Sequence, residues 1–185
     1  NSSLKWISNY ILDLSKKELG DNILQTSSNH FNMIHEHVSL NKLNDFRLNI
    51  INGINSNSEF RKHYYQLARP YLEALVGNEL AMQQRVNLSI QFPQDDSSLL
   101  PVHADTWSGD SPFEVVVWTP LVDCYGSKSM YILPPKQNSK LEIALPKRGG
   151  NSSEDLYRSI SDEVLWLEVK YGEVLIFNQT LPHGN

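Results

Sequence analysis

The sequence lacks most of the features that mark a secreted or membrane-spanning protein. It holds one cysteine, Cys124, in 185 residues, which excludes an intramolecular disulfide and a cysteine-rich zinc or iron–sulfur site. No run approaches the roughly 18 apolar residues needed to span a bilayer, and the first residues carry no basic stretch followed by an apolar one. We therefore expect a cytoplasmic protein with no membrane partner.

Positive charge is also scarce. Lys and Arg total 16 against 21 Asp and Glu, which gives a formal net charge of −5 and a sequence pI of about 5.6. Because Lys and Arg form no cluster, the chain offers no evident footprint for a phosphate backbone, and we expect no nucleic-acid partner. The 40% of hydrophobic residues suffices for a folded core, and the length fits one domain.

The spacing of apolar residues changes near residue 80. Before that point apolar residues recur at helical spacing, which predicts helices over residues 4–20, 43–54 and 56–77. The third begins with Ser56 and Glu59 at the spacing of a capping box, and Pro70 predicts a kink inside it. We expect residues 1–80 to form a helical N-terminal layer.

After residue 80 the apolar spacing becomes two. Residues 85–92 alternate between polar and apolar side chains, which is typical of a strand with one buried face. Further short strand candidates lie at residues 99–103, 114–119, 129–133, 140–145, 163–169 and 173–178. Many short strands without intervening helices favour a mainly β fold with N-terminal helices, in which a β sandwich or barrel at 81–185 packs against the helical layer as one structural domain.

The segment with the clearest chemistry is His103-Ala104-Asp105. In an extended strand the side chains of residues i and i+2 point to the same face, so His103 and Asp105 can converge on one ion. His183, directly after the last predicted strand, would complete two imidazoles and one carboxylate. This set leaves coordination positions open, which suits a non-haem Fe(II) oxygenase better than a closed structural zinc site. A surface histidine followed by an Asx turn is the alternative.

Four spaced motifs together resemble one enzyme family. They are the runs 103–118, 128–134 and 172–177 and the triplet His183-Gly184-Asn185. In these motifs the sequence resembles the 2-oxoglutarate/Fe(II)-dependent oxygenases related to phytanoyl-CoA dioxygenase. Within that superfamily it is most similar to the group encoded in bacterial carbohydrate and streptomycin-type biosynthesis clusters. The resemblance extends over residues 83–185.

The resemblance implies a fold, a cofactor and a reaction. The fold would be a double-stranded β-helix, a cupin-like jelly roll with Fe(II) at its mouth, held by His103, Asp105 and His183. The co-substrates would be 2-oxoglutarate and O₂, and the protein would bind and orient them. The reaction would hydroxylate or oxidise a small polar metabolite, such as a sugar or an aminocyclitol intermediate. No catalytic residue beyond the metal ligands is implied.

One part of the family pattern is missing. The distal carboxylate of 2-oxoglutarate is usually held by an Arg, sometimes a Lys, about ten residues beyond the second histidine, because a guanidinium pairs bidentately with a carboxylate. This sequence ends two residues after His183. We therefore expect it to be C-terminally incomplete, with that anchor outside it. Lys128, beside Ser129 at the start of a predicted strand, is the best internal co-substrate contact, and Arg85 is a second.

Other polar residues are candidates for the pocket. If the polar face of the predicted strand 85–92 lines the site, Asn87 and Gln91 would contact the co-substrate and Gln83 the substrate; if it faces solvent, they have no special role. Trp107, next to Asp105, is expected to shape the substrate pocket. His30, His35 and His37 are interpreted as residues of a surface helix or loop.

Two other functions remain open from the residues alone. One is a non-catalytic jelly-roll module that binds carbohydrate, or a decayed oxygenase, and the other is a cupin-type isomerase. A cupin-type isomerase usually presents more histidines from one cluster of strands, whereas the predicted strand 99–103 before Asp105 carries only His103. The partner expected in each case is a small molecule, and the sequence does not indicate an oligomeric state.

Overall fold

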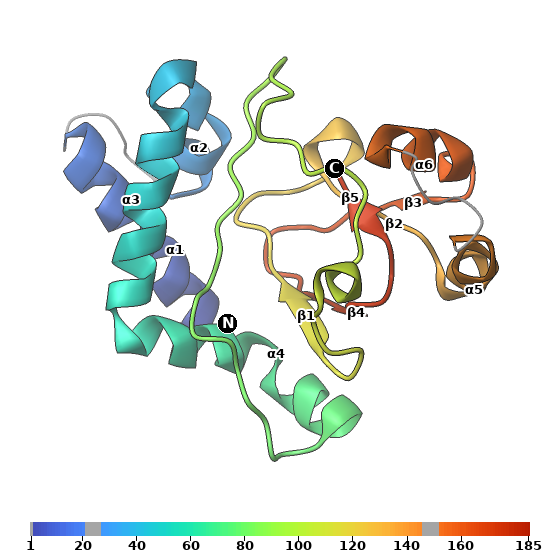
Figure 1. The fold of residues 1–185 in the computed structure, drawn as a ribbon. Coiled ribbons are helices and arrows are strands. Elements are labelled where there is room, and N and C mark those ends of the chain that lie inside the picture. The colour runs from blue at the N-terminus through green and yellow to red at the C-terminus, as the bar shows by residue number, and fades with distance from the viewer. Residues whose placement is uncertain (1, 21–26, 146–151) are drawn as a thin grey trace. The chain divides into compact units, whose positions relative to one another are not determined.

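The computed structural model describes residues 2–20, 27–145 and 152–185, and the chain forms two compact units, Asn1–Ser98 and Leu99–Asn185 (Figure 1). About 51% of the described residues are helical and 10% are strand, and these strands make two small sheets of two and three strands. The prediction of a mainly β, double-stranded β-helix fold is therefore wrong. Within the described residues, no helix combines the length and apolar composition needed to cross a bilayer.

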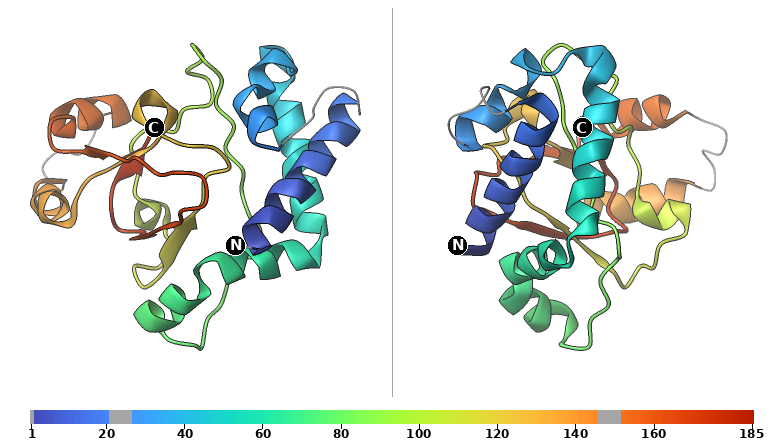
Figure 2. Two further views of the ribbon diagram at one scale, coloured as in Figure 1. Left: turned by 180° about the vertical axis from the view of Figure 1, so that it is seen from behind. Right: turned by 90° about the vertical axis from the view of Figure 1, so that its left-hand side faces the viewer.

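The N-terminal unit is built from helices, and the three predicted ones are confirmed. These are α1 (Ser2–Leu19), α3 (Leu43–Ser56) and α4 (Ser58–Val76), with the short α2 (Ser27–Asn32), η2 (Ile34–Glu36) and η3 (Leu40–Lys42) between α1 and α3. Figure 2 shows α1 lying beside α3, with α4 crossing near the start of α1. Their shared core includes Ile7, Ile50, Ile54 and Phe60, each at most 2% exposed.

Local signals set the ends of these helices. Gly20 follows the last residue of α1 with φ 91°, and Gly77 follows α4 with φ 86°, a backbone region in which glycine has no steric penalty. The N-cap of α4 is Asn57, whose side chain accepts a hydrogen bond from the Glu59 N–H at 3.0 Å. The predicted cap residue, Ser56, is therefore wrong, because the N-cap lies one residue later at Asn57. Pro70 lies inside α4 without ending it.

The segment after α4 is not a strand, so the prediction of a strand over residues 85–92 is wrong. The Asn55 side chain donates to the Val86 carbonyl at 2.9 Å and accepts from the Val86 N–H at 2.8 Å. Arg61 likewise donates to the Met82 carbonyl at 2.8 Å. Helix side chains therefore satisfy the backbone groups of Val86 and the Met82 carbonyl, which a neighbouring strand would otherwise pair. The alternation did mark burial, since Val86 is only 6% exposed.

The C-terminal unit mixes short strands with helices. In chain order its elements are η4 (Asp105–Ser108), β1 (Val115–Trp118), η5 (Gly126–Lys128), β2 (Tyr131–Ile132), α5 (Pro135–Ala144), α6 (Ser153–Ile160), β3 (Leu165–Trp166), β4 (Leu175–Asn178) and β5 (His183–Gly184). Four predicted strands each contain one of these strands. The predicted strand 140–145 is wrong, because it lies almost wholly in α5. Leu141 is 4% exposed but Ile143 is 77% exposed, so the apparent alternation was misleading.

Both sheets of this unit are antiparallel, with strand orders β1-β4 and β3-β2-β5. One face of the three-stranded sheet packs against α5 and α6 through a cluster centred on Tyr131, Leu133 and Leu141. The other face contributes Met130 and Ile132 to a second cluster, which includes side chains of β1 and β4. Figure 1 shows the two helices and the β1-β4 ribbon on opposite sides of this sheet. The β2 strand thus lies between two hydrophobic clusters.

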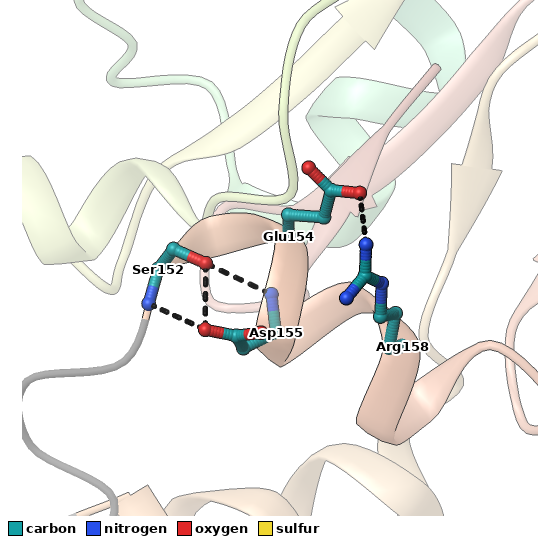
Figure 3. Close-up of polar contacts among 4 residues, drawn as sticks. All are labelled: Ser152, Glu154, Asp155 and Arg158. Atoms are coloured by element: carbon teal, nitrogen blue, oxygen red, sulfur yellow. Dashed lines mark hydrogen bonds and ion pairs between the residues drawn. The ribbon is translucent and has the colours of Figure 1, made fainter.

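A capping box starts α6, a helix that the strand-only interpretation of this region overlooked (Figure 3). The Ser152 hydroxyl oxygen accepts from the Asp155 N–H at 3.1 Å, and the Asp155 carboxylate accepts from the Ser152 N–H at 3.4 Å. One turn later, Arg158 pairs with Glu154 at 2.7 Å. At the other end of the helix, Ile160 is 5% exposed and belongs to the cluster around Tyr131 and Leu141.

His30 is not a surface residue, and that prediction is wrong. Its side chain is 1% exposed, and neither ring nitrogen has a hydrogen-bond partner among the described residues. Burial, with smaller contributions from the nearby charges of His37 and Lys16, lowers the pKa of His30 to about 4. The ring is therefore neutral in the folded protein at neutral pH.

We expect His30 to make the N-terminal unit acid-sensitive. The unfolded chain takes up a proton near pH 6.5 and the folded chain only near pH 4, so the free energy of unfolding should fall as the pH drops through this window. Urea denaturation at pH 7, 5.5 and 4.5 measures the loss. His30→Leu should reduce it, whereas the matched variant His35→Leu should not. Equal acid sensitivity in the His30→Leu variant and the wild type would contradict this assignment.

Candidate metal centre

The two predicted histidine ligands meet where residues 100–103 run beside β5. The His103 N–H donates to the His183 carbonyl at 3.0 Å, and the His183 N–H donates to the His103 carbonyl at 2.8 Å. Residues that exchange both bonds stand directly opposite, with their side chains on one face. The ring centroids are accordingly 4.3 Å apart. The predicted strand 99–103 is reduced to this isolated bridge.

Asp105 joins the two histidines through a change of backbone conformation. Ala104 is extended, with φ −122° and ψ 134°, and Asp105 then begins the η4 turn. One Asp105 carboxylate oxygen lies 3.7 Å from His103 Nε2. One ligand atom each from His103, Asp105 and His183 all lie within 4.8 Å of one another. The three side chains are therefore close enough to bind a metal ion.

Backbone carbonyls orient both imidazoles in the same way. His103 Nδ1 lies 2.8 Å from the Pro101 carbonyl oxygen, and His183 Nδ1 lies 2.9 Å from the Leu181 carbonyl oxygen. Since a carbonyl only accepts, each Nδ1 carries the proton and each neutral ring keeps its lone pair on Nε2. Metal-binding histidines are commonly held in this way, with the second nitrogen fixed by a carbonyl or carboxylate.

The group is buried on one side and open on the other. His183 is 8% exposed, whereas the His103 and Asp105 side chains are 34% and 27% exposed. Burial lowers the pKa of His183 and the charge of His103 adds to this, against the opposing effects of the Leu181 hydrogen bond and the Asp105 charge. His183 therefore keeps its metal-binding, neutral form to a lower pH than a free imidazole. The Phe177 ring stands edge-on to His183 at 5.0 Å and closes the buried side.

Three other predicted site residues lie in the same compact unit. Lys128 ends η5, with its ammonium 5.5 Å from the centroid of the Tyr125 ring. Ser129 is 4% exposed, and its hydroxyl has no hydrogen-bond partner within the described part of the chain. Trp107 lies in η4, two residues after Asp105, and is 44% exposed.

The other four predicted contacts belong to the N-terminal unit. Gln83, Arg85 and Asn87 are exposed and Gln91 is partly buried, all in the extended segment after α4. They were grouped because they would share one face of a strand. Since residues 85–92 form no strand, that argument for their convergence does not hold.

Sequence reasoning missed the groups that support the ligands. The carbonyls of Pro101 and Leu181 act through the backbone, which carries no residue-type signal. Phe177 was assigned to a strand without a role at the site, although its position in a predicted buried strand near His183 was a usable signal.

Comparison of the chain with protein-family models, with curated proteins and with solved structures finds no match. The geometry of the metal-ligand group therefore carries the functional argument.

We expect His103, Asp105 and His183 to bind one divalent transition-metal ion. His103→Ala or Asp105→Ala should weaken this binding by more than about 100-fold. Loss of a residue that only supports a ligand already lowers metal affinity roughly 10- to 100-fold, and these two residues are ligands themselves. Anaerobic calorimetry with Fe(II), or with Co(II) as a stable substitute, measures the affinity. The control His37→Ala removes a histidine of the N-terminal unit and should leave the affinity unchanged. Metal affinity that survives both ligand substitutions would contradict the site.

Proposed function

We propose that the chain is an Fe(II)- and 2-oxoglutarate-dependent oxygenase that hydroxylates or oxidises a small polar metabolite. The observation that supports this most directly is the convergence of His103, Asp105 and His183, with both imidazoles presenting Nε2. The resemblance of four sequence motifs to such oxygenases supports the same proposal. The single cysteine fits a reducing compartment, and we place the protein in the cytoplasm.

The donor set fits Fe(II). Two imidazole nitrogens and one carboxylate oxygen on one side of an ion are the ligands of non-haem Fe(II) oxygenases, which keep the remaining positions open. A structural zinc site would instead close its coordination with a fourth protein ligand. Within the described residues, the group holds three such ligands, and two of them are partly exposed.

Each residue of the group has a distinct task in this proposal. His103, Asp105 and His183 hold the ion, while the Pro101 and Leu181 carbonyls keep the imidazoles in the binding tautomer. When bound, Fe(II) would supply the centre at which O₂ and 2-oxoglutarate react. The protein binds and orients the reactants, and the apolar ring of Phe177 excludes water from the buried side.

Lys128 and Ser129, which are consecutive in the sequence, are proposed to bind the co-substrate. The Lys128 ammonium would pair with a carboxylate of 2-oxoglutarate, as charge-assisted hydrogen bonds to carboxylates are among the stronger ones. The buried Ser129 hydroxyl has no hydrogen-bond partner among the residues that the structure describes. Because buried polar groups are nearly always satisfied, a bound carboxylate would supply that partner. Trp107, two residues after Asp105 in the chain, is 44% exposed and would contact the substrate.

Anaerobic addition of 2-oxoglutarate to the Fe(II)-loaded protein tests the proposal. The co-substrate should chelate the ion through its 2-oxo acid end and produce a visible metal-to-ligand charge-transfer band. That band should be absent from His103→Ala, which lacks one ligand. If Fe(II) binds but no band appears with millimolar 2-oxoglutarate, the co-substrate assignment is wrong and the site is a metal site of another kind.

We expect Lys128→Ala to weaken 2-oxoglutarate binding about tenfold or more, because a hydrogen bond to a charged group contributes about 1.5–3 kcal/mol. The concentration of 2-oxoglutarate that gives half the band measures this affinity, and the Fe(II) affinity should stay unchanged. Lys136→Ala, which removes an exposed lysine in the first turn of α5, is the matched control. Equal half-saturation in both variants would exclude Lys128 from the co-substrate site.

A further inference from the structure

We propose that Gly184 and Asn185 are positioning residues that hold the His103 ligand in place against His183. Their loss should weaken metal binding, which rests on the proposed function, and should loosen the backbone around His103, which does not. Both residues directly follow His183, and their contacts reach the segment that carries His103. Neither residue is a metal ligand.

Asn185 makes two hydrogen bonds to a single residue, Leu100. Its side-chain carbonyl oxygen accepts from the Leu100 N–H, and its own N–H donates to the Leu100 carbonyl at 3.2 Å. Three residues later, His103 exchanges its two backbone bonds with His183. The segment is therefore fastened to the strand on both sides of Pro101, whose carbonyl orients the His103 ring.

Gly184 permits this close approach. A Cβ at position 184 would lie 2.9 Å from the Leu100 carbonyl oxygen and 2.8 Å from Tyr131 Cζ, and it would collide with the Tyr131 hydroxyl. Tyr131 has little room to move, because it is 3% exposed and its ring lies 5.0 Å from Tyr157 and 5.1 Å from Trp166, centroid to centroid. Any larger residue at 184 would therefore push β5 away from one of its two neighbours.

The Leu100 end of the segment 100–103 depends on these contacts because Leu100 is largely exposed. The segment forms no regular strand, and only the His103 bridge continues its pairing with β5. Leu99 and Leu100 are 37% and 52% exposed, so packing holds this end of the segment weakly. Val102, at 4% exposed, is the only residue between Leu100 and His103 that anchors it in the core. Without the Asn185 bonds, the position of the His103 ring should vary.

Metal affinity tests the first consequence. Asn185→Ala should weaken Co(II) binding by about tenfold or more, which is the effect of losing a residue that supports a metal ligand. Asn185→Asp keeps an acceptor oxygen for the Leu100 N–H and should restore most of the affinity. The control Asn9→Ala, at an exposed position of α1, should bind Co(II) as the wild type does. The absorption spectrum of bound Co(II) reports whether the ligand set itself has changed.

Amide hydrogen exchange in the metal-free protein tests the second consequence. Asn185→Ala should speed exchange of the Leu100 and His103 amides about tenfold or more, while the Val116 and Phe177 amides of the β1-β4 sheet keep their rates. Gly184→Ala should have the same effect if it folds. Unchanged exchange at Leu100 and His103 in Asn185→Ala would overturn the proposal. If the wild type binds no Co(II), the proposed function fails, and the exchange rates still decide whether Asn185 positions His103.

Discussion

The C-terminal unit depends on the reciprocal backbone hydrogen bonds between His103 and His183. This pair joins residues that lie far apart in the sequence and sets their side chains on one face, 4.3 Å apart between ring centroids. Asp105 then needs only a local turn to reach His103. A single antiparallel contact therefore creates the metal-ligand group, and a one-residue shift in its register would turn one histidine to the opposite face.

The surrounding core holds that contact from both sides. Ile132 of β2 lies opposite His183, and Tyr131 lies opposite Gly184, so the alternation of β2 sends one residue into each hydrophobic cluster. The helices α5 and α6 cover the Tyr131 side, and β1 and β4 cover the other. Phe177, from β4, reaches the His183 ring across the second cluster. Packing and metal-site geometry therefore share the same short strands.

Sequence patterns predicted the N-terminal helices well and the β region only in part. In α1, α3 and α4 the apolar period matches the buried face, and glycine ends α1 and α4. The period of two misled at residues 85–92, where the Asn55 side chain, and not a neighbouring strand, binds the backbone of Val86. It misled again at 140–145, where only Leu141 is buried. Alternation identifies a half-buried segment, but it does not specify which groups satisfy its backbone.

The sequence by itself determined the residue types of the metal-ligand group and the helices α1, α3 and α4. The histidines and the carboxylate have a chemistry that needs no fold to be recognised, and helical periodicity is a local property. Only the tertiary structure decided that His103 and His183 pair, that Pro101 and Leu181 carbonyls fix their tautomers, and that Asn185 reaches Leu100. It also replaced the expected double-stranded β-helix with two small sheets and helices. These outcomes depend on backbone groups and long-range contacts, which leave no mark on residue type or spacing.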